Sequence, residues 1–344
     1  MRLFSFPPRH LFHPVMTPNR RVTFETFMRA ALHDPERGYY ARRIRAVGGP
    51  RGDFTTVPMH AGDLLARAIA GWAADAMRRT RCRDLIEMGP GEGTLMRGVL
   101  RHLPWTLRLR ARGHFVESSP VLTARQQAAT GRPRATWHAD SETAMRACGG
   151  RAVIFSNELV DAFPVRVFRK SGGGWDELGV EIDASGRVVR ECFFPSSAGL
   201  PDSSVFAADH PEGQRVEVHD SYRAWLTGWL PLWRAGEMLT IDYGDTAAAL
   251  YTRRPHGTLR GYLMHGRVTG PDVYQNIGMQ DLTADVNFSD LAAWAAPWCA
   301  SREPQTFAGF LRERLGRGTG GGDLTDESLA GGAFKVLVQH PVAT

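Results

Sequence analysis

The sequence predicts an α/β fold in which a parallel sheet is covered by helices on both faces. Between residues 84 and 156, short apolar runs alternate with segments of helical periodicity. Three glycines in the stretch "EMGPGEG" follow the first of these runs, where a strand would be followed by a helix. This alternation is typical of doubly wound sheets, which bind their ligands at such a turn.

The segment before the first core strand is expected to be largely helical. In "VTFETFMRAALH" (22–33), apolar residues recur at helical spacing, Thr23 stands at the N-cap position, and Pro35 and Gly38 would end the helix. A glycine-rich loop at 47–58 precedes a second helix through "AGDLLARAIAGWAADAMRR". The prolines of the first 21 residues predict an irregular N-terminus.

The core elements follow in order, with an insertion between them. After "NELVDAFPV" the pattern changes to short antiparallel strands joined by the turns "SGGG" and "ASGR". A helix at 216–234 then precedes the return to the core, and its tryptophans at every fourth position predict a packed face. The core strands are expected at 84–88, 113–117, 135–139, 152–156, 237–244 and 334–339.

These patterns divide the chain into five segments. They are an irregular N-terminus (1–21), a helical segment (22–83), the first part of the core (84–163), a β-rich insertion (164–215) and the remainder of the core with the C-terminal segment (216–344).

Composition narrows the classes of partner. The formal net charge is +6, but the arginines are scattered along the chain, which argues against a stable nucleic-acid partner. No apolar run approaches the ~20 residues of a membrane span, so no membrane partner is expected. The four cysteines lie far apart without a C-x-x-C pair, which argues against a metal site or a disulfide framework and predicts a cytoplasmic protein.

The glycine-rich turn predicts the class of ligand. Gly89, Pro90, Gly91 and Gly93 form a G-x-G-x-G pattern behind the acid Glu87, unlike the G-x-G-x-x-G of dinucleotide sites. Glycines let the backbone approach a ligand closely, and the next helix offers free N–H groups. Acids beside the turn favour a cationic ligand over a phosphate, which indicates S-adenosyl-L-methionine (SAM), with S-adenosyl-L-homocysteine as its product.

Two further acids would complete the cofactor site. Glu117, followed by Ser118, ends the second strand, where an acid commonly binds ribose hydroxyls. The alternative for Glu117 is an acid that faces solvent. Asp140 follows the third strand and could bind the adenine amino group, although a surface aspartate is an equal alternative.

The chain resembles the MidA-like family of SAM-dependent methyltransferases, the family of a mitochondrial complex I assembly protein arginine methyltransferase. The resemblance rests on seven segments: "FMRAALHDPERGYY", "GDFTTVP", "LIEMGPGEGTLM", "SNELVDAFPV", "IDYG", "GTLRGYLMH" and "QDLTADVNFSDL". It implies a Rossmann-like seven-stranded core with an N-terminal helical lid and a β-rich insertion. It also implies methyl transfer to an arginine of a partner protein, with Asp53 near the cofactor and Glu158 and Asp161 near the acceptor.

The spacing of "NELVD" suggests how the acceptor is held. Glu158 and Asp161 lie three residues apart and would share one face of a helical turn. They would clamp a guanidinium, with Asn157 orienting it. The alternative is that Asn157 caps a helix and the acids occupy its first turn. His265 could act as a base or pin the substrate loop, or be an ordinary loop histidine.

Two more acids have weaker expectations. Asp242 is expected at the carboxyl edge of the sheet as a second acid, and Asp285 is expected to cap a turn.

Two rival functions stay open at this point. The first is methylation of a nucleic acid or a small molecule, although the chain lacks an N-P-P-[FY] tetrad after the fourth strand and a Pro-Cys nucleophile. The second is a SAM-binding assembly chaperone without turnover. The short segments "MHAGDLL" and "RGTGGGDLTDESLAGGA" leave room for this reading, because they would trim the lid and a partner surface.

Overall fold

The computed structural model describes residues 20–43, 63–130, 135–183, 185–252, 254–264, 266–316 and 321–342. Its central sheet contains β2 (Asp84–Met88), β3 (Arg112–Val116), β4 (Ala135–His138), β5 (Ala152–Asn157), β10 (Met238–Asp245), β15 (Cys299–Ser301) and β17 (Phe334–Pro341). Within the described residues these seven strands follow the order β15-β17-β10-β5-β2-β3-β4, while β14 (Val286–Asn287) and β16 (Gln305–Thr306) pair beside β10 and β17. In this spatial order, the neighbours β10, β5, β2, β3 and β4 are parallel to one another, and β17 is antiparallel to β10. This arrangement confirms the predicted α/β core.

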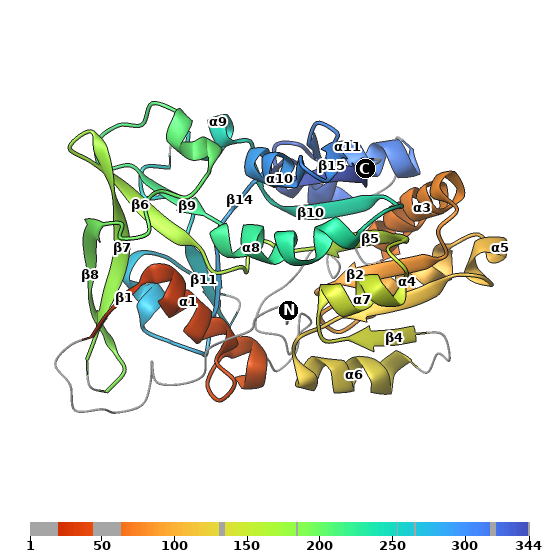
Figure 1. Cartoon of the computed structure of the whole chain (residues 1–344), viewed down its shortest axis with the longest axis horizontal. Coiled ribbons are helices and arrows are strands. Elements are labelled where there is room, and N and C mark those ends of the chain that lie inside the picture. Colours follow the sequence, from red (N-terminus) through yellow and green to blue (C-terminus); the bar gives the residue numbers. More distant parts are fainter. Residues whose placement is uncertain are drawn as a thin grey trace.

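Helices cover both faces of the central sheet (Figure 1). They are α3 (Asp63–Thr80), α4 (Thr94–His102), α5 (Trp105–Arg108), α6 (Pro120–Thr130), α7 (Ser141–Ala147), α8 (Asp220–Trp229), α9 (Ala247–Leu250), α10 (Phe288–Ala295), α11 (Phe307–Leu315) and α12 (Ala330–Ala333). The apolar sides of α3, α4 and α11 form one buried cluster with the sheet, and those of α7, α8 and α10 form another. Of the expected tryptophan face, Trp229 and Trp233 are buried, as predicted.

A smaller antiparallel sheet lies at the left of Figure 1. It contains β1 (Arg20–Thr23), β6 (Arg166–Ser171), β7 (Gly174–Ile182), β8 (Val188–Pro195) and β9 (Arg215–Val218). The turn between β6 and β7 is Gly172-Gly173, with φ of 55° and 81°, which suits a two-residue hairpin. The β-rich insertion is therefore confirmed. Its last strand was not predicted, because residues 215–218 pair with β6 and the helix α8 begins only at Asp220.

The N-terminal helix α1 (Phe24–His33) packs on the smaller sheet. Thr23 caps it as predicted, since its side chain accepts a hydrogen bond from the Thr26 amide at 3.2 Å. Phe24, Phe27 and Met28 are fully buried there with apolar residues of β6 and β7. The same cluster includes Leu122 of α6, and α1 also contacts β13 and η1, so whether it covers the cofactor stays a prediction. The segment that joins α1 to α3 lies partly outside the described residues, at 44–62.

Three short strands form a third, antiparallel sheet in the order β12-β11-β13. They are β11 (Arg260–Leu263), β12 (Gly266–Val268) and β13 (Asp281–Thr283), with short helical turns at η1 (Tyr39–Arg43), η2 (Ser204–Ala207), η3 (Leu230–Leu232), η4 (Gly270–Tyr274) and η5 (Gly322–Leu324). Strand β13 pairs with β11, and α1 contacts β13. None of the described helices is both long enough and apolar enough to span a bilayer.

Candidate active site

The glycine turn joins β2 to α4 at the carboxyl end of the central sheet. Gly89, Gly91 and Gly93 all have left-handed backbones, with φ of 68°, 53° and 69°. A Cβ at Gly89 would lie 2.7 Å from Cδ1 of Leu159, in the loop after β5. Pro90 is buried between the first two glycines. Only glycine adopts this backbone cheaply. The amides of Gly89 and Gly93 already donate to the carbonyls of Val116 at 3.1 Å and Pro90 at 2.7 Å, so the turn offers a ligand close approach to its backbone.

Glu87 supports the turn from below. It is 3% exposed, and its Oε2 accepts a hydrogen bond from the Met96 amide at 3.1 Å. Gly93, the N-cap of α4, has no side chain for this purpose. Burial raises the pKa of Glu87 to about 8, although the Met96 amide opposes the shift and Glu117 adds to it. Glu87 therefore acts first as a substitute cap of α4, which fixes the turn.

Glu117 faces the same turn from the end of β3. Its carboxylate accepts hydrogen bonds from the amide of Ser119 at 2.8 Å and from Nε2 of Gln126 at 3.3 Å. Gln126 Nε2 also donates to the Gly91 carbonyl at 2.7 Å, so it joins the two loops. Burial raises the pKa of Glu117 to about 7. Ser118 is exposed beside it. Glu117 therefore does not simply face solvent, and its contact with a ribose stays a prediction.

Asp140 has a structural contact that the sequence did not indicate. It is the N-cap of α7, and its Oδ1 accepts a hydrogen bond from the Thr143 amide at 2.7 Å. Its contact with adenine stays a prediction. Asp53 and His265 lie outside the described residues.

The loop after β5 is not helical, so the expected helical turn at Glu158 to Asp161 is wrong. Glu158 has a φ of 49°, and residues 158–163 form bends and turns. The alternative, in which Asn157 caps a helix, fails for the same reason, because Asn157 is the last residue of β5. A left-handed non-glycine residue costs about 1–3 kcal/mol and is found most often at functional sites. The two acids still belong to one short loop.

Asp242 holds this loop in place. It is fully buried within β10, one residue past the last pair with β5, and its Oδ2 accepts the amides of Val160 at 2.8 Å and Leu159 at 3.1 Å. The Glu158 amide donates to the Ile241 carbonyl at 3.0 Å. Burial raises the pKa of Asp242 well above its ordinary value, and the neighbouring Asp161 adds to the shift. Its position at the carboxyl edge of the sheet was predicted, and its role as a clasp for the loop was not.

Asn157 and Glu158 are in direct contact. Nδ2 of Asn157 donates to Oε1 of Glu158 at 2.9 Å. Oδ1 of Asn157 is buried and has no hydrogen-bond partner among the described residues. A buried acceptor without a donor is costly, so this oxygen is suited to receive a donor from a bound molecule.

Asp161 is one of several acids in a buried cluster. It is 5% exposed, and burial raises its pKa to about 6, opposed by Arg260 and reinforced by Asp285. Asp281, at the start of β13, is 3% exposed, and burial together with Asp161 raises its pKa to about 7. Tyr40 Oη donates to Asp281 Oδ1 at 2.8 Å. We call Glu158, Asp161, Asp242 and Asp281 the acid cluster.

One cation adjoins the acid cluster, and it already has a partner. Arg260 is 5% exposed and forms an ion pair with Asp285, which also pairs with Arg254. The expectation that Asp285 caps a turn is therefore wrong, because its carboxylate is taken by two guanidinium groups. Sequence reasoning missed Tyr40, Asp281 and Arg260 as site residues, although all three lie in the segments "HDPERGYY", "QDLTADVNFSDL" and "GTLRGYLMH".

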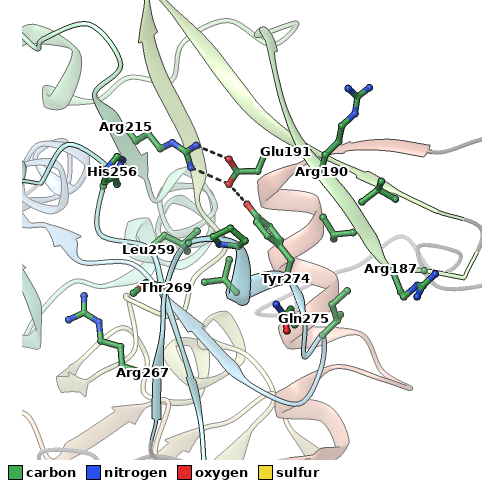
Figure 2. A pocket seen from close by; sticks show the side chains of 18 of the residues that line it. Arg187, Arg190, Glu191, Arg215, His256, Leu259, Arg267, Thr269, Tyr274 and Gln275 are labelled. Carbon is green, nitrogen blue, oxygen red and sulfur yellow. Dashed lines mark hydrogen bonds and ion pairs between the residues drawn. The ribbon is translucent and has the colours of Figure 1, made fainter.

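A cavity of about 1270 Å³ opens between the insertion and the loops around η4. Figure 2 shows Arg215, Glu191 and Tyr274 joined at its centre, with Arg187, Arg190 and Arg267 around it. Arg215 Nη2 lies 2.7 Å from Glu191 Oε2, and Tyr274 Oη donates to Oε1 at 2.7 Å. Residues 257–259 line this cavity and lead directly to Arg260. None of its lining residues was predicted as a site residue.

Comparison with known proteins identifies the family of the chain and its cofactor. Residues 68–303 match the model of a family described as S-adenosyl-L-methionine-dependent methyltransferases. The mitochondrial protein arginine methyltransferase NDUFAF7 of Bos taurus is 28% identical over 340 residues, which cover 88% of this chain and 72% of that protein. The Caenorhabditis elegans homolog is 28% identical over 310 residues, with 79% and 67% covered.

A solved structure has a similar fold and contains the product of SAM. A COG1565 superfamily member from Burkholderia thailandensis, crystallised with S-adenosyl-homocysteine, is 27% identical with a TM-score of 0.78. The match covers 93% of this chain and 88% of that one. The methyltransferase fold and SAM as cofactor are therefore confirmed.

The comparison also corrects one expectation. A cytoplasmic location was predicted, but the NDUFAF7 relatives are named as mitochondrial proteins, so that prediction is wrong. The four cysteines are free, which excludes disulfides among them. Free cysteines do not distinguish one reducing compartment from another, and that is why the inference failed.

Proposed function

Because the chain belongs to the family of SAM-dependent methyltransferases, we propose that it transfers the methyl group of SAM to an arginine side chain of a partner protein. Two observations support this acceptor. The relatives with the broadest coverage are named protein arginine methyltransferases. The loop beyond the glycine turn places a buried acid cluster where a cationic acceptor would lie.

The cofactor side fits the nucleoside. SAM supplies a methyl group on a cationic sulfur. The left-handed glycines bend the chain at the carboxyl end of β2, and Leu159 of the acceptor loop packs directly against Gly89. Glu117 is held by Ser119 and Gln126 so that its carboxylate faces the turn, where it binds the ribose hydroxyls. Gln126 also donates a hydrogen bond to the Gly91 carbonyl, so one side chain joins Glu117 to the glycine turn.

The acid cluster is the observation that carries the proposal. Three of its carboxyls are buried and Glu158 is half-buried, while Arg260, the cation that acts on Asp161 and Asp281, is already paired with Asp285. The pKa values of Asp161 and Asp281 are raised to about 6 and about 7, so their ionised forms lack sufficient compensation. A guanidinium about 4 Å from one ionised carboxyl gains roughly 4 kcal/mol at an effective dielectric of about 20. The cluster therefore fits a cation, and arginine is the side chain whose planar donors match paired carboxylates.

The acid cluster would also make the guanidinium a better nucleophile. A guanidinium is a weak nucleophile, because its lone pairs are delocalised and its charge repels the sulfonium. Glu158 binds one side of the group and Asp161 another, which draws positive charge away from the attacking nitrogen. Oδ1 of Asn157 accepts a remaining N–H. Methylation releases one proton from the attacking nitrogen, and Asp161, with a pKa of about 6, accepts it.

The cavity beside the insertion supports a protein as the acceptor. Its volume of about 1270 Å³ exceeds the roughly 300–1,000 Å³ of small-ligand pockets. Its lining continues through residues 257–259 to Arg260 beside the acid cluster. A polypeptide segment that lies in this cavity would present its arginine from the insertion side.

The test is label transfer. The purified protein is incubated with SAM carrying a labelled methyl group and a protein extract, and the labelled band is hydrolysed to identify methylarginine. Glu158→Gln and Asp161→Asn should abolish labelling while keeping affinity for S-adenosyl-homocysteine. Asp323→Asn, an exposed acid in η5, is the matched control and should label normally.

Each other outcome identifies a different function. Label on nucleic acid or on a small molecule, with none on protein, would make the chain a methyltransferase of another class. Binding of S-adenosyl-homocysteine without any transfer would indicate an assembly chaperone. Full labelling by Glu158→Gln and Asp161→Asn would refute the clamp.

A further inference from the structure

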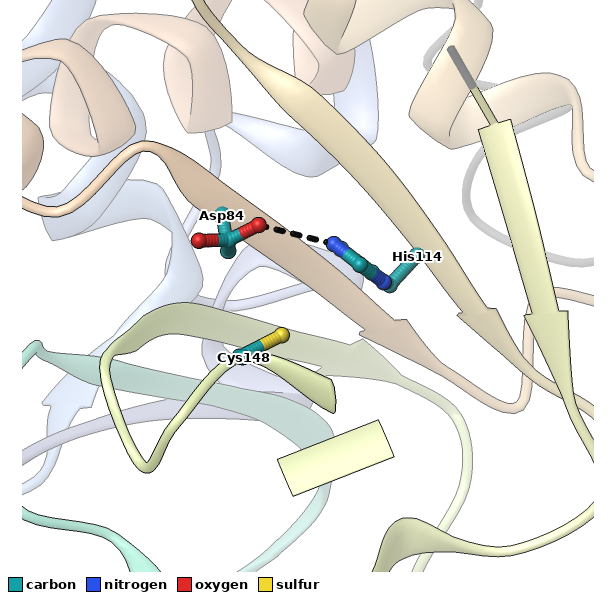
Figure 3. A group of neighbouring side chains, drawn as sticks. All are labelled: Asp84, His114 and Cys148. Carbon is teal, nitrogen blue, oxygen red and sulfur yellow. Dashed lines mark hydrogen bonds and ion pairs between the residues drawn. The ribbon is translucent and has the colours of Figure 1, made fainter. Parts of the chain in front are cut away.

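A second group of polar side chains lies at the opposite end of the central sheet from the glycine turn. Asp84 is the first residue of β2, His114 lies in β3, and Cys148 follows α7 (Figure 3). All three are buried, with 4%, 6% and 7% exposed. One oxygen of Asp84, one nitrogen of His114 and Sγ of Cys148 lie within 4.8 Å of one another. The methyltransferase site uses none of them.

The fold fixes these three residues to one face. Asp84 pairs with Arg112 across β2 and β3, so His114, two residues further on, points to the same side of the sheet as Asp84. Cys148 ends α7, which packs against β3 on that side. Backbone pairing therefore brings the three side chains together although they are distant in the sequence.

The neighbours of the group orient its ligand atoms. His114 Nε2 lies 2.9 Å from Asp84 Oδ1, and His114 Nδ1 lies 3.0 Å from Nε2 of His138. The other oxygen of Asp84 accepts a hydrogen bond from Arg112 Nη2 at 2.7 Å. Metal-binding imidazoles and carboxylates generally have such outer partners, which set the tautomer and the direction of the ligand atom.

We propose that Asp84, His114 and Cys148 bind one Zn²⁺ ion. Thiolate, imidazole and carboxylate are the three side-chain ligands of zinc, and one of each is present. Because Arg112 occupies the second oxygen of Asp84, the fourth position belongs to a water molecule. The two anionic ligands balance the charge of the ion, which would otherwise be costly to bury.

Zinc binding would release one proton from this group of residues. Zinc takes the place of the hydrogen between His114 Nε2 and Asp84, and His114 then carries its hydrogen on Nδ1 and donates it to His138. His138 shifts its own hydrogen to its other nitrogen, so both rings stay neutral. Cys148 loses its thiol proton to solvent, and one proton is released for each ion bound.

Sequence motifs for zinc sites do not detect this group, because its three ligand residues come from three separate elements. The sequence argument against a metal considered neighbouring cysteines only. Here β2, β3 and the end of α7 would be tied together by the ion, which would stabilise the half of the sheet that carries Glu87 and Glu117.

Metal analysis of the purified, untagged full chain tests the proposal. After incubation with ZnSO₄ and gel filtration, elemental analysis and native mass spectrometry should show one zinc per chain, and the thermal unfolding temperature should exceed that of chelator-treated protein. Cys148→Ala and His114→Gln should lose the ion. His138→Gln, which changes only the outer partner, should weaken zinc affinity by about 10–100-fold. Cys299→Ala is the matched control, since Cys299 is equally buried but lies elsewhere, and it should keep one zinc.

Two results with zinc would overturn the proposed site, and a measurement with cobalt gives a third test. One is wild-type protein that carries no zinc after incubation and unfolds at the same temperature with or without it. The other is full zinc retention by Cys148→Ala. If the variants fail to fold, Co²⁺ added to wild-type protein decides: a thiolate-to-cobalt absorption band supports the site, and its absence refutes it. None of these measurements depends on methyl transfer.

Discussion

Gly89→Ala tests whether the cofactor turn and the acceptor loop are in steric contact. The added Cβ would lie 2.7 Å from Cδ1 of Leu159, which is 0.7 Å closer than the 3.4 Å at which ordinary contact begins. Leu159 lies between Glu158 and Asp161, so a displaced Leu159 would shift the clamp. The φ of 68° adds a second cost, because a residue with a Cβ loses about 1–2 kcal/mol in the left-handed region.

The two costs can be separated by a matched control. Gly213 has a φ of 83°, and a Cβ there would meet no atom within 4 Å. Gly213→Ala should therefore lose only the backbone cost of about 1–2 kcal/mol. Gly89→Ala should lose this and about 0.5–1.5 kcal/mol more, because Cδ1 of Leu159 is the end of a flexible side chain and can yield by leaving its rotamer. Urea unfolding of both variants measures the difference.

Binding gives the sharper readout. Gly89→Ala should weaken S-adenosyl-homocysteine at least tenfold, which is about 1.4 kcal/mol, while Gly213→Ala should bind like wild type in calorimetry. Adding Leu159→Ala removes the clashing methyl group and should recover part of the lost affinity. If Gly89→Ala binds and unfolds like Gly213→Ala, the turn and the loop are not in contact and the reasoning fails.

Four further outcomes follow from the buried charges. Methylation should be weak below about pH 6 and reach a plateau above about pH 7, because Asp161 and Asp281 must be ionised to bind a guanidinium, and a flat profile would refute this. The pKa values of Asp161 and Asp281 are raised in the folded state, so the folded state binds more protons than the unfolded state. The unfolding free energy of the free protein should therefore fall as the pH rises from about 5 to 8, and urea titrations at several pH values would measure this. Tyr40→Phe should raise the pH midpoint of the activity profile and weaken acceptor binding while sparing S-adenosyl-homocysteine, since the hydrogen bond that it removes lowers the pKa of Asp281; an unchanged profile and acceptor KM would contradict the contact. Arg166→Met should destabilise the insertion by about 3–5 kcal/mol, because it leaves Glu177 buried without its partner, and a smaller loss in urea would mean that Glu177 is hydrated.

The parts of the fold that the sequence predicted are those set by local rules. The strand at 84–88, its glycine turn and the helix at 94–102 combine an apolar run, left-handed glycines and helical spacing. The hairpin of the insertion was predicted for the same reason, since Gly172-Gly173 suits its two-residue turn. In each case the information lies within about ten residues.

The errors arose where distant residues decide. Glu158 and Asp161 have the spacing of a helical turn, but Asp242, more than eighty residues away, accepts the amides of the intervening residues and holds them in an open loop. Residues 215–218 continue the pattern of the next helix, yet they pair with β6 and become a strand. No local pattern contains such partners, so tertiary contacts override the expected structure.

Tyr40 shows why the site needs the whole chain. Its phenol donates to Asp281 in the acid cluster, and its backbone carbonyl accepts a hydrogen bond from Ser119 Oγ at 3.0 Å. Ser119 in turn donates its amide to Glu117, the acid expected to hold the ribose. One residue of η1 therefore contacts both the cofactor side and the acceptor side. Because these contacts share η1, ordering one side lowers the entropy that remains to be lost on the other. We therefore predict that S-adenosyl-homocysteine strengthens acceptor binding in wild-type protein and does so less in Tyr40→Phe, as calorimetry would show.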